Sequence, residues 1–532
     1  MEHCRPIPIM AMISRRGFGL ALAAMGSPAV GASAAARWIA SMPSIHVGGR
    51  PRVTHGVASG DVEASSAVIW SRCDQAARMV VEWSEDELFR TRQHRVGPVV
   101  GLDSDHTAKL LLRDLPPGRR IFYRVCFEDR QGVSGDWEVG SLVTASTNSG
   151  KSGDSAVHFV WSGDTCGQGY GIDESRGGMR TYQSMMAQDP QFFVHSGDTI
   201  YADNPLVPEL RLPDGSVWKN RVTEEKSKVA ETLGEFRGNY RYNLLDSHVR
   251  RFNARVPMFA QWDDHEVLNN WYPGEVLPVS AGYRVRDVNL LAARSRQAFF
   301  EYMPISNHPQ RQIYRRIRRG PQCELFFLDL RSHRGTNGPN RQPVSGPDTD
   351  YLGRSQLAWL KEALAASTAT WKFVCSDMPL GLMVRDGADA FENGANGDGI
   401  PLGRELEIAS LLRHLRDHRV RNVVWLTADV HYCASHFYDP AQAQFSEFDG
   451  FWEFVSGPLH AGTFGPGTLD NTFGPQVRFS SRQPGQAISG PWSTEQFFGS
   501  VRIAPVTQVA TVTHLNRDGQ RVWSIDLEPT RS

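Results

Sequence analysis

Short apolar runs that end in acidic or imidazole side chains recur after residue 156, and they limit the folds open to this 532-residue chain. Clear examples are VHFVWSGD, QFFVHSGDTIYAD, VPMFAQWDDHE and NVVWLTADVHY. Runs of this length are typical of strands buried on both faces. Because helical patterns lie between them, the sequence predicts an α/β layered domain whose ligands bind beyond the carboxyl ends of the strands.

Two of the intervening segments carry helical periodicity. RSQLAWLKEALAAS has Ser355 as its predicted N-cap. ELEIASLLRHLRDH has four apolar residues on one helical face, namely Ile408, Leu411, Leu412 and Leu415. The final VATVTHLNRDGQRVWSIDLEP predicts a pair of strands joined at Asp518-Gly519.

The first part of the chain has a different pattern. Residues 45–145 contain short alternating segments such as SSAVIWSRC and RIFYRVCFED, separated by turn signals such as LPPGRR. This spacing predicts a small antiparallel β-sandwich of the immunoglobulin or fibronectin type. The Ser/Gly-rich residues 146–155 are typical of a linker, and residues 155–528 form the predicted catalytic domain.

The N-terminus carries an export pattern. Arg15 and Arg16 precede Phe18 and Leu20, and a small-residue apolar run with an A-x-A-like stretch follows. Residues 1–36 are therefore expected to be a twin-arginine signal peptide, read by the twin-arginine export machinery and leading to the periplasm or the medium. The alternative is an uncleaved membrane anchor, but the run is shorter than the roughly 20 residues that a span requires.

Composition excludes several classes of partner. The formal net charge is -1, so no long-range attraction to nucleic acid or to an anionic membrane is expected. The seven cysteines include no C-x-x-C pair, and their scatter does not indicate a disulfide framework. No sequence-specific nucleic-acid binding and no stable membrane anchor are expected, and the chain is predicted to be a monomer.

The residues at the strand ends have the chemistry of metal ligands. Asp164, Asp198, the Asp263-Asp264-His265 triplet and Asp429-Val430-His431 each follow an apolar run. Carboxylates are hard oxygen ligands, and a phenolate such as that of Tyr201 favours an ion such as Fe(III). The set is rich in oxygen and has no paired thiolates, so a shared metal site is predicted rather than a structural zinc site.

The motifs FVHSGDTIYAD, QWDDHEVLNNWYPGE, DLRSHRG and LTADVHY resemble those of the alkaline phosphatase D family, a branch of the metallophosphoesterases related to purple acid phosphatases. VTHGVASGDVEASSAVIWSRC resembles the start of that family's β-sandwich. The resemblance implies a four-layer α/β/β/α core after the sandwich. It also implies an Fe(III) site beside a second divalent metal, expected to be Ca(II).

The resemblance further implies roles for individual residues. Asp164, Tyr201 and His431 would bind iron, and Asp198 would bridge the two metals. The expected ligands of the second metal are Asp264, Asn269 and Asp429. His265 would be the general acid that protonates the leaving oxygen.

Several roles have alternatives. In SGDTCGQGYG, Cys166 instead of Asp164 is an alternative iron ligand. Arg331 is predicted to hold a phosphate oxygen, and the alternative is a surface salt bridge. His195 either orients a ligand or is a buried histidine. The Gly/Asn-rich residues 386–407 are either a loop that shapes substrate access or a tolerated insertion.

The expected function is hydrolysis of phosphate monoesters or diesters by a metal-bound hydroxide. A second possibility is an exported binding protein that retains the metal fold without activity. A third possibility is a serine-dependent phosphatase, because GDSAV places Ser155 in a context like that of a nucleophilic serine. Against this, the fragment lies before a predicted strand instead of at the end of one.

Overall fold

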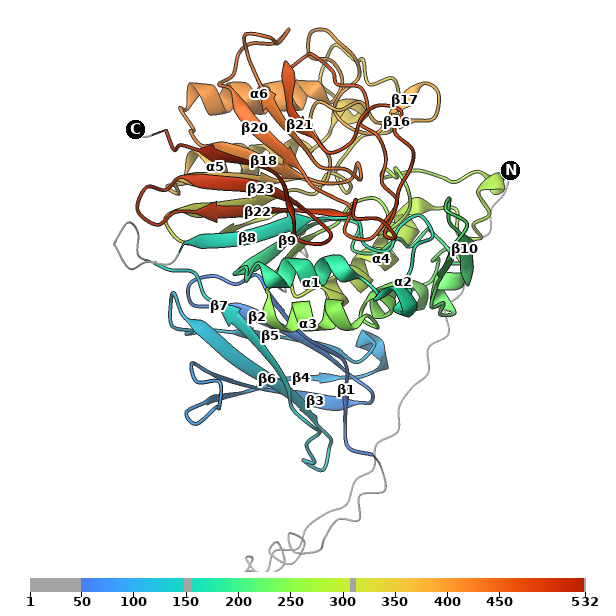
Figure 1. The fold of residues 1–532 in the computed structure, drawn as a ribbon, viewed down its shortest axis with the longest axis vertical. Helices are drawn as coiled ribbons and strands as arrows, with labels where there is room; N and C mark the ends of the chain where they lie inside the picture. The colour runs from blue at the N-terminus through green and yellow to red at the C-terminus, as the bar shows by residue number, and fades with distance from the viewer. Residues whose placement is uncertain (1–48, 148–155, 307–311, 531–532) are drawn as a thin grey trace, which may run out of the picture. The chain divides into compact units, whose positions relative to one another are not determined.

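The structure is a computed structural model that describes residues 49–147, 156–306 and 312–530 (Figure 1). The predicted signal peptide lies outside these residues, as does most of the predicted linker. Residues from Arg50 onward form one compact unit.

Two large mixed sheets and a smaller antiparallel sheet make up the unit. The nine-stranded sheet has the order β24-β23-β22-β8-β9-β12-β1-β2-β5. Its bounds are β1 Val53–Gly60, β2 Ala67–Cys73, β5 Thr107–Leu112, β8 Val157–Ser162, β9 Phe192–Ser196, β12 Met258–Gln261, β22 Phe497–Ile503, β23 Ala510–Asn516 and β24 Arg521–Leu527. The seven-stranded sheet has the order β13-β14-β15-β18-β20-β19-β21. Its bounds are β13 Arg315–Arg318, β14 Cys323–Phe327, β15 Trp371–Cys375, β18 Val423–Thr427, β19 Ala434–Tyr438, β20 Phe451–Val455 and β21 Pro475–Ser480.

Alternating side chains on the strands build a four-layer core. Phe159 of β8 and Phe373 of β15 meet between the two sheets, with ring centroids 5.3 Å apart. The neighbouring Val160 faces the opposite way, into a cluster shared with the helices α1 Arg180–Ala187, α2 Leu233–Asn243, α3 Ser247–Arg255 and α4 Val288–Tyr302. On the second sheet, Val374 faces α5 Arg354–Ala365 and α6 Glu405–Asp417. The predicted α/β/β/α arrangement is therefore confirmed.

The sandwich continues into the first of these sheets. Its outer sheet has the order β4-β3-β6-β7. The bounds are β3 Ala77–Ser84, β4 Gln93–Val100, β6 Arg120–Glu128 and β7 Glu138–Val143. The opposing layer is β1, β2 and β5, and β1 pairs in parallel with β12 of the core at Gly60 and Met258. One hydrophobic cluster consequently runs from the sandwich into the space between the two core sheets.

The structure confirms most of the local predictions and corrects one. All four predicted apolar residues of α6 are buried, and β23 and β24 pair as the predicted hairpin. Helix α5 begins at Arg354 with Gly353 as its N-cap, so the prediction of Ser355 was wrong. Two small hairpins complete the fold, β10 Glu209–Arg211 with β11 Val217–Lys219, and β16 Arg385–Asp386 with β17 Ala390–Phe391. Among the described helices, none has the length and apolarity needed to cross a bilayer.

Candidate metal centre

Four strands place an aspartate at the same position, two residues beyond the end of the strand. Asp164 follows β8, Asp198 follows β9, Asp263 follows β12 and Asp429 follows β18. The strands β8, β9 and β12 are parallel neighbours, so their carboxyl ends share one edge of the sheet. Asp164, Asp198 and Asp429 have φ values of 68°, 52° and 66°. Non-glycine residues adopt this left-handed conformation mainly where surrounding structure enforces it, as at functional sites.

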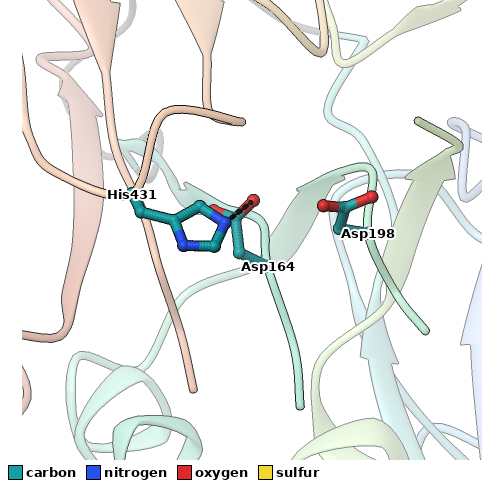
Figure 2. Close-up of side chains that lie close together, drawn as sticks. All are labelled: Asp164, Asp198 and His431. Atoms are coloured by element: carbon teal, nitrogen blue, oxygen red, sulfur yellow. Dashed lines mark ion pairs between the residues drawn. The ribbon is translucent and has the colours of Figure 1, made fainter. Parts of the chain in front are cut away.

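These aspartates join Asp264, His265 and His431 in three groups of potential metal ligands. In each group the ligand atoms lie within 4.8 Å of one another. The groups are Asp164, Asp198 and His431; Asp198, Asp264 and His265; and Asp263, Asp264 and Asp429. Figure 2 shows Asp164 and His431 pointing at one another, with Asp198 nearby. Asp198 and Asp264 each belong to two of these groups, so each carboxylate lies between two neighbouring sets of potential ligands.

Tyr201 completes the first group. Its Oη lies 2.8 Å from Nε2 of His431, and that nitrogen is 3.5 Å from Oδ1 of Asp164. Nδ1 of His431 is 2.6 Å from the carbonyl oxygen of Gly462, which fixes the ring. Burial lowers the pKa of His431 to about 4, which keeps the imidazole neutral, as a metal ligand must be.

The centre carries more buried negative charge than its protein partners neutralise. Burial, and then neighbouring carboxylates, raises the pKa of Asp198 well above its usual range. Burial likewise raises the pKa of Asp164 and of Asp429. Oδ2 of Asp164 is buried and has no hydrogen-bond partner among the described residues. Carboxyl groups gathered in this way either keep their protons or ionise beside bound cations, so the cluster favours cation binding. Carboxylate, phenol and imidazole donors fit a hard, highly charged ion such as Fe(III) beside a second hard cation.

Glu266 holds the loops of this centre together. Its carboxylate accepts hydrogen bonds from the backbone N–H groups of Asp198 at 3.0 Å, Thr199 at 2.6 Å and Asp263 at 2.7 Å. Gly197 allows the close approach of the β9 and β12 loops, since an added Cβ would lie 2.5 Å from Cβ of Asp263 and the φ of Gly197 is 104°. Sequence reasoning missed Glu266, although it is the last residue of the DDHE motif.

His265 is paired with a second carboxylate that sequence reasoning also missed. Nδ1 of His265 lies 2.7 Å from Oδ1 of Asp203, and Oδ2 of Asp203 accepts a hydrogen bond from the backbone N–H of Asn269. Burial opposes ionisation of His265, but Asp203 and Asp264 outweigh it and raise its pKa to about 9. The raised pKa favours the protonated imidazole, and among the described residues only Nδ1 of the ring has a hydrogen-bond partner.

Arg331 lies below the centre and is fully buried. Its guanidinium contacts Asp263 through Nε at 2.7 Å and through Nη2 at 2.6 Å, and it also pairs with Glu392. Its side chain is 0% exposed, and Arg331 is not among the described residues that line the cleft around Asp198, His265 and His431. This burial contradicts the alternative prediction of a surface salt bridge, because the Arg331 side chain does not lie on the surface.

The three groups open into a cleft of about 800 Å³. Six of its lining residues are candidate ligands or the candidate acid, namely Asp198, Asp264, His265, Asn269, Asp429 and His431. Arg385 is the single arginine or lysine among the described residues that line it. Glu392 also lines the cleft and comes from the Gly/Asn-rich residues 386–407. Arg404 binds the backbone of this segment through the carbonyl oxygens of Phe391 and Glu392 at 3.0 and 2.8 Å.

The remaining predicted residues lie in different settings. Asn269 is exposed and lines the cleft. His195 is 0% exposed and Nε2 lies 3.3 Å from Oγ1 of Thr165, the residue after Asp164, so it supports that loop. Cys166 is 1% exposed and belongs to the hydrophobic cluster beneath α1 to α4. Among the described residues, it is in none of the three ligand groups.

Comparison with known proteins identifies the family. The family model described as PhoD-like phosphatase matches residues 159–514, and that family's N-terminal domain matches residues 40–146. The chain belongs to the PhoD-like phosphatase family. Its relatives include alkaline phosphatase D of Bacillus subtilis (strain 168), which is 26% identical over 401 residues. That match covers 71% of this chain and 64% of the relative, so the chain spans less than two thirds of the relative's length.

Two solved structures share the fold of this chain. The structure of PhoD aligns with a TM-score of 0.63 at 20% identity, covering 90% of this chain and 92% of the other. Purple acid phosphatase PPD1 from yellow lupin (Lupinus luteus) seeds aligns with a TM-score of 0.54 at 13% identity. This alignment covers 90% of this chain and 74% of the lupin chain. Both likenesses support the predicted sandwich and four-layer core.

Proposed function

We propose that this chain is an exported, metal-dependent phosphoesterase that hydrolyses phosphate monoesters, diesters or both. The observation that carries the proposal is the convergence of four strand-end aspartates with Tyr201 and His431 at the base of one open cleft. Membership of a phosphatase family agrees with it. The protein acts as a monomer, and export follows from the twin-arginine pattern at Arg15 and Arg16.

The residues divide between two metal positions. Asp164, Tyr201 and His431 would hold Fe(III), and Asp198 would bridge to a second divalent cation, Ca(II), held by Asp264, Asn269 and Asp429. When bound, such a pair supplies Lewis-acid activation of the phosphoryl group and of the attacking water. Cys166 is less well placed than Asp164 to be the iron ligand, because it lies in a hydrophobic cluster.

The protein side chains supply proton transfer and positioning. His265 is the general acid for the leaving oxygen, since it is protonated, lines the cleft and lies within the second ligand group. Asp203 positions His265 through its 2.7 Å contact with Nδ1. Arg331 is a positioning residue, because its buried guanidinium holds Asp263 and Glu392 under the centre. His195 positions the loop that carries Asp164.

Hydrolysis assays on the purified protein test the proposal. 4-Nitrophenyl phosphate and bis(4-nitrophenyl) phosphate are incubated with the protein, with and without a chelator, across pH 5 to 10. At least one ester is expected to be hydrolysed, and activity should be lost with the chelator and in Asp198→Ala. Asp189→Asn is the control, because the Asp189 side chain is 85% exposed. Activity that survives both the chelator and Asp198→Ala would exclude a metal mechanism.

A further inference from the structure

One wall of the cleft is apolar, although the centre beside it is acidic. Phe464 stacks on the ring of His431, with centroids 5.0 Å apart and planes at 23°. Val430 directly precedes His431 in the chain, and Met383 and Val384 line the same cleft. All four apolar side chains are half-buried, so part of each faces the open space.

This wall is backed by a hydrophobic cluster of its own. Val384 and Val430 pack on a small set of buried residues, namely Leu382, Tyr432, Ala434 and Val455. The backbone of the segment is also fixed, because the N–H of Met383 donates to the carbonyl oxygen of Thr468 at 2.9 Å. Val384 and Val430 are therefore packed parts of the fold, and Phe464 is held by its stacking on His431. Apolar surface held next to a charged centre marks a place where an apolar ligand group binds.

Phe464 lies on the other side of Tyr201 and His431 from the general acid. His265 stacks on Tyr201 at 4.2 Å, Tyr201 bonds to His431, and His431 carries Phe464 on its ring. Two rings therefore separate His265 from Phe464. The surroundings of His265 are polar instead, since Asp203 is its partner and Asn204 lines the cleft nearby. A group that leaves with a proton from His265 departs on this polar side.

We propose that Phe464, Val384 and Val430 form a subsite for a flat apolar ester group of the substrate, the group that remains on the phosphate after hydrolysis. Phosphodiesters with one such group are then the preferred substrates. This inference rests on the proposed phosphoesterase function. In the step, a water oxygen bonds to phosphorus and the bond from phosphorus to the leaving oxygen breaks. A leaving alkoxide takes a proton from His265, whereas 4-nitrophenolate leaves as the anion. The products are an alcohol and a phosphomonoester that keeps the apolar group, and the proton released by water restores His265.

Two diesters with the same leaving group test the subsite. Methyl 4-nitrophenyl phosphate and phenyl 4-nitrophenyl phosphate both release 4-nitrophenolate and differ only in the retained group. The wild-type kcat/KM is expected to be about tenfold higher for the phenyl diester, which is the size of one stacked ring. Phe464→Ala should bring this ratio towards one, and Phe464→Leu should keep most of it. Phe437→Ala is the control, since Phe437 is half-buried on β19 and does not line the cleft.

The possible outcomes separate the subsite from the proposed function. Equal kcat/KM for the two diesters in the wild type, or an equal loss on both in Phe464→Ala, would overturn the subsite while phosphoesterase activity stands. Hydrolysis of monoesters alone would also overturn it. If no ester is hydrolysed, the proposed function fails, and titration calorimetry with phenylphosphonate and methylphosphonate then tests the subsite. Tighter binding of phenylphosphonate by about tenfold would support it, and equal binding would refute it.

Discussion

The pairing of Asp203 with His265 makes a prediction that depends on the leaving group. The two side chains are 10% and 11% exposed and are 2.7 Å apart, so Asp203 fixes both the orientation and the protonated state of the ring. In Asp203→Asn the shape is kept and the charge is lost. Because Nδ1 loses its carboxylate, general acid catalysis should weaken by about 10- to 100-fold for an ester with an alkyl leaving group.

Esters with different leaving groups reveal whether the loss is in proton transfer. 4-Nitrophenolate leaves without a proton, so Asp203→Asn should lower kcat for its esters by less than about threefold. The ratio of kcat for glycerol phosphate to kcat for 4-nitrophenyl phosphate should therefore fall, with the metal content unchanged. Asp189→Asn should leave the ratio unaltered. Equal loss on both substrates, or loss of metal, would refute the assigned role of Asp203.

Three further changes have expected outcomes. Arg331→Met should lower the free energy of unfolding by about 3–5 kcal/mol in denaturant titration, because it leaves the buried Asp263 carboxylate unpaired. An unchanged free energy of unfolding would contradict a stabilising role for this buried ion pair. Glu405 is 1% exposed, and burial followed by the charge of Asp470 raises its pKa to about 9. The stability linked to this raised pKa is fully present below the pKa of Glu405 in the unfolded chain and is lost as the pH rises to about 9. The free energy of unfolding of Glu405→Gln, relative to that of the wild type, should therefore rise between pH 5 and pH 9. A difference that stays constant over this range would refute the prediction. Gly197→Ala should destabilise the protein and reduce its metal content, since the new Cβ would meet Asp263, and a normal metal content would count against that contact.

Much of the centre was predictable because its residues follow local patterns. Asp164, Asp198 and Asp429 come directly after apolar runs, and the position beyond a strand end is a local property of the sequence. Glu266 and Asp203 lie within the motifs, but their partners are loops far along the chain, so nothing local indicated their contacts. The surface alternative for Arg331 was wrong because its position after an apolar run does not reveal that its partners, Asp263 and Glu392, come from two distant loops.

The same limit applies to the fold. Alternation predicted the sandwich strands and the buried runs, since burial on one or two faces leaves a period that can be read directly. The pairing of β1 with β12 joins Gly60 to Met258 and merges the sandwich with the core sheet. This contact depends on which strand edges remain free after the core forms, and no local pattern contains that information. The N-cap of α5 was misplaced by two residues because Gly353 gave no side-chain signal.

Iron content and visible absorption of the purified protein test the central claim most directly. Tyr201 lies against His431 and beside Asp164 and Asp198, so iron bound there should give a purple-to-brown charge-transfer band from the phenolate. We predict about one iron per chain, with the band lost in Tyr201→Phe and both iron and activity lost in Asp198→Ala. Colourless, iron-free protein that still hydrolyses phosphoesters would contradict the assignment of Tyr201 and the strand-end aspartates to an iron-containing centre.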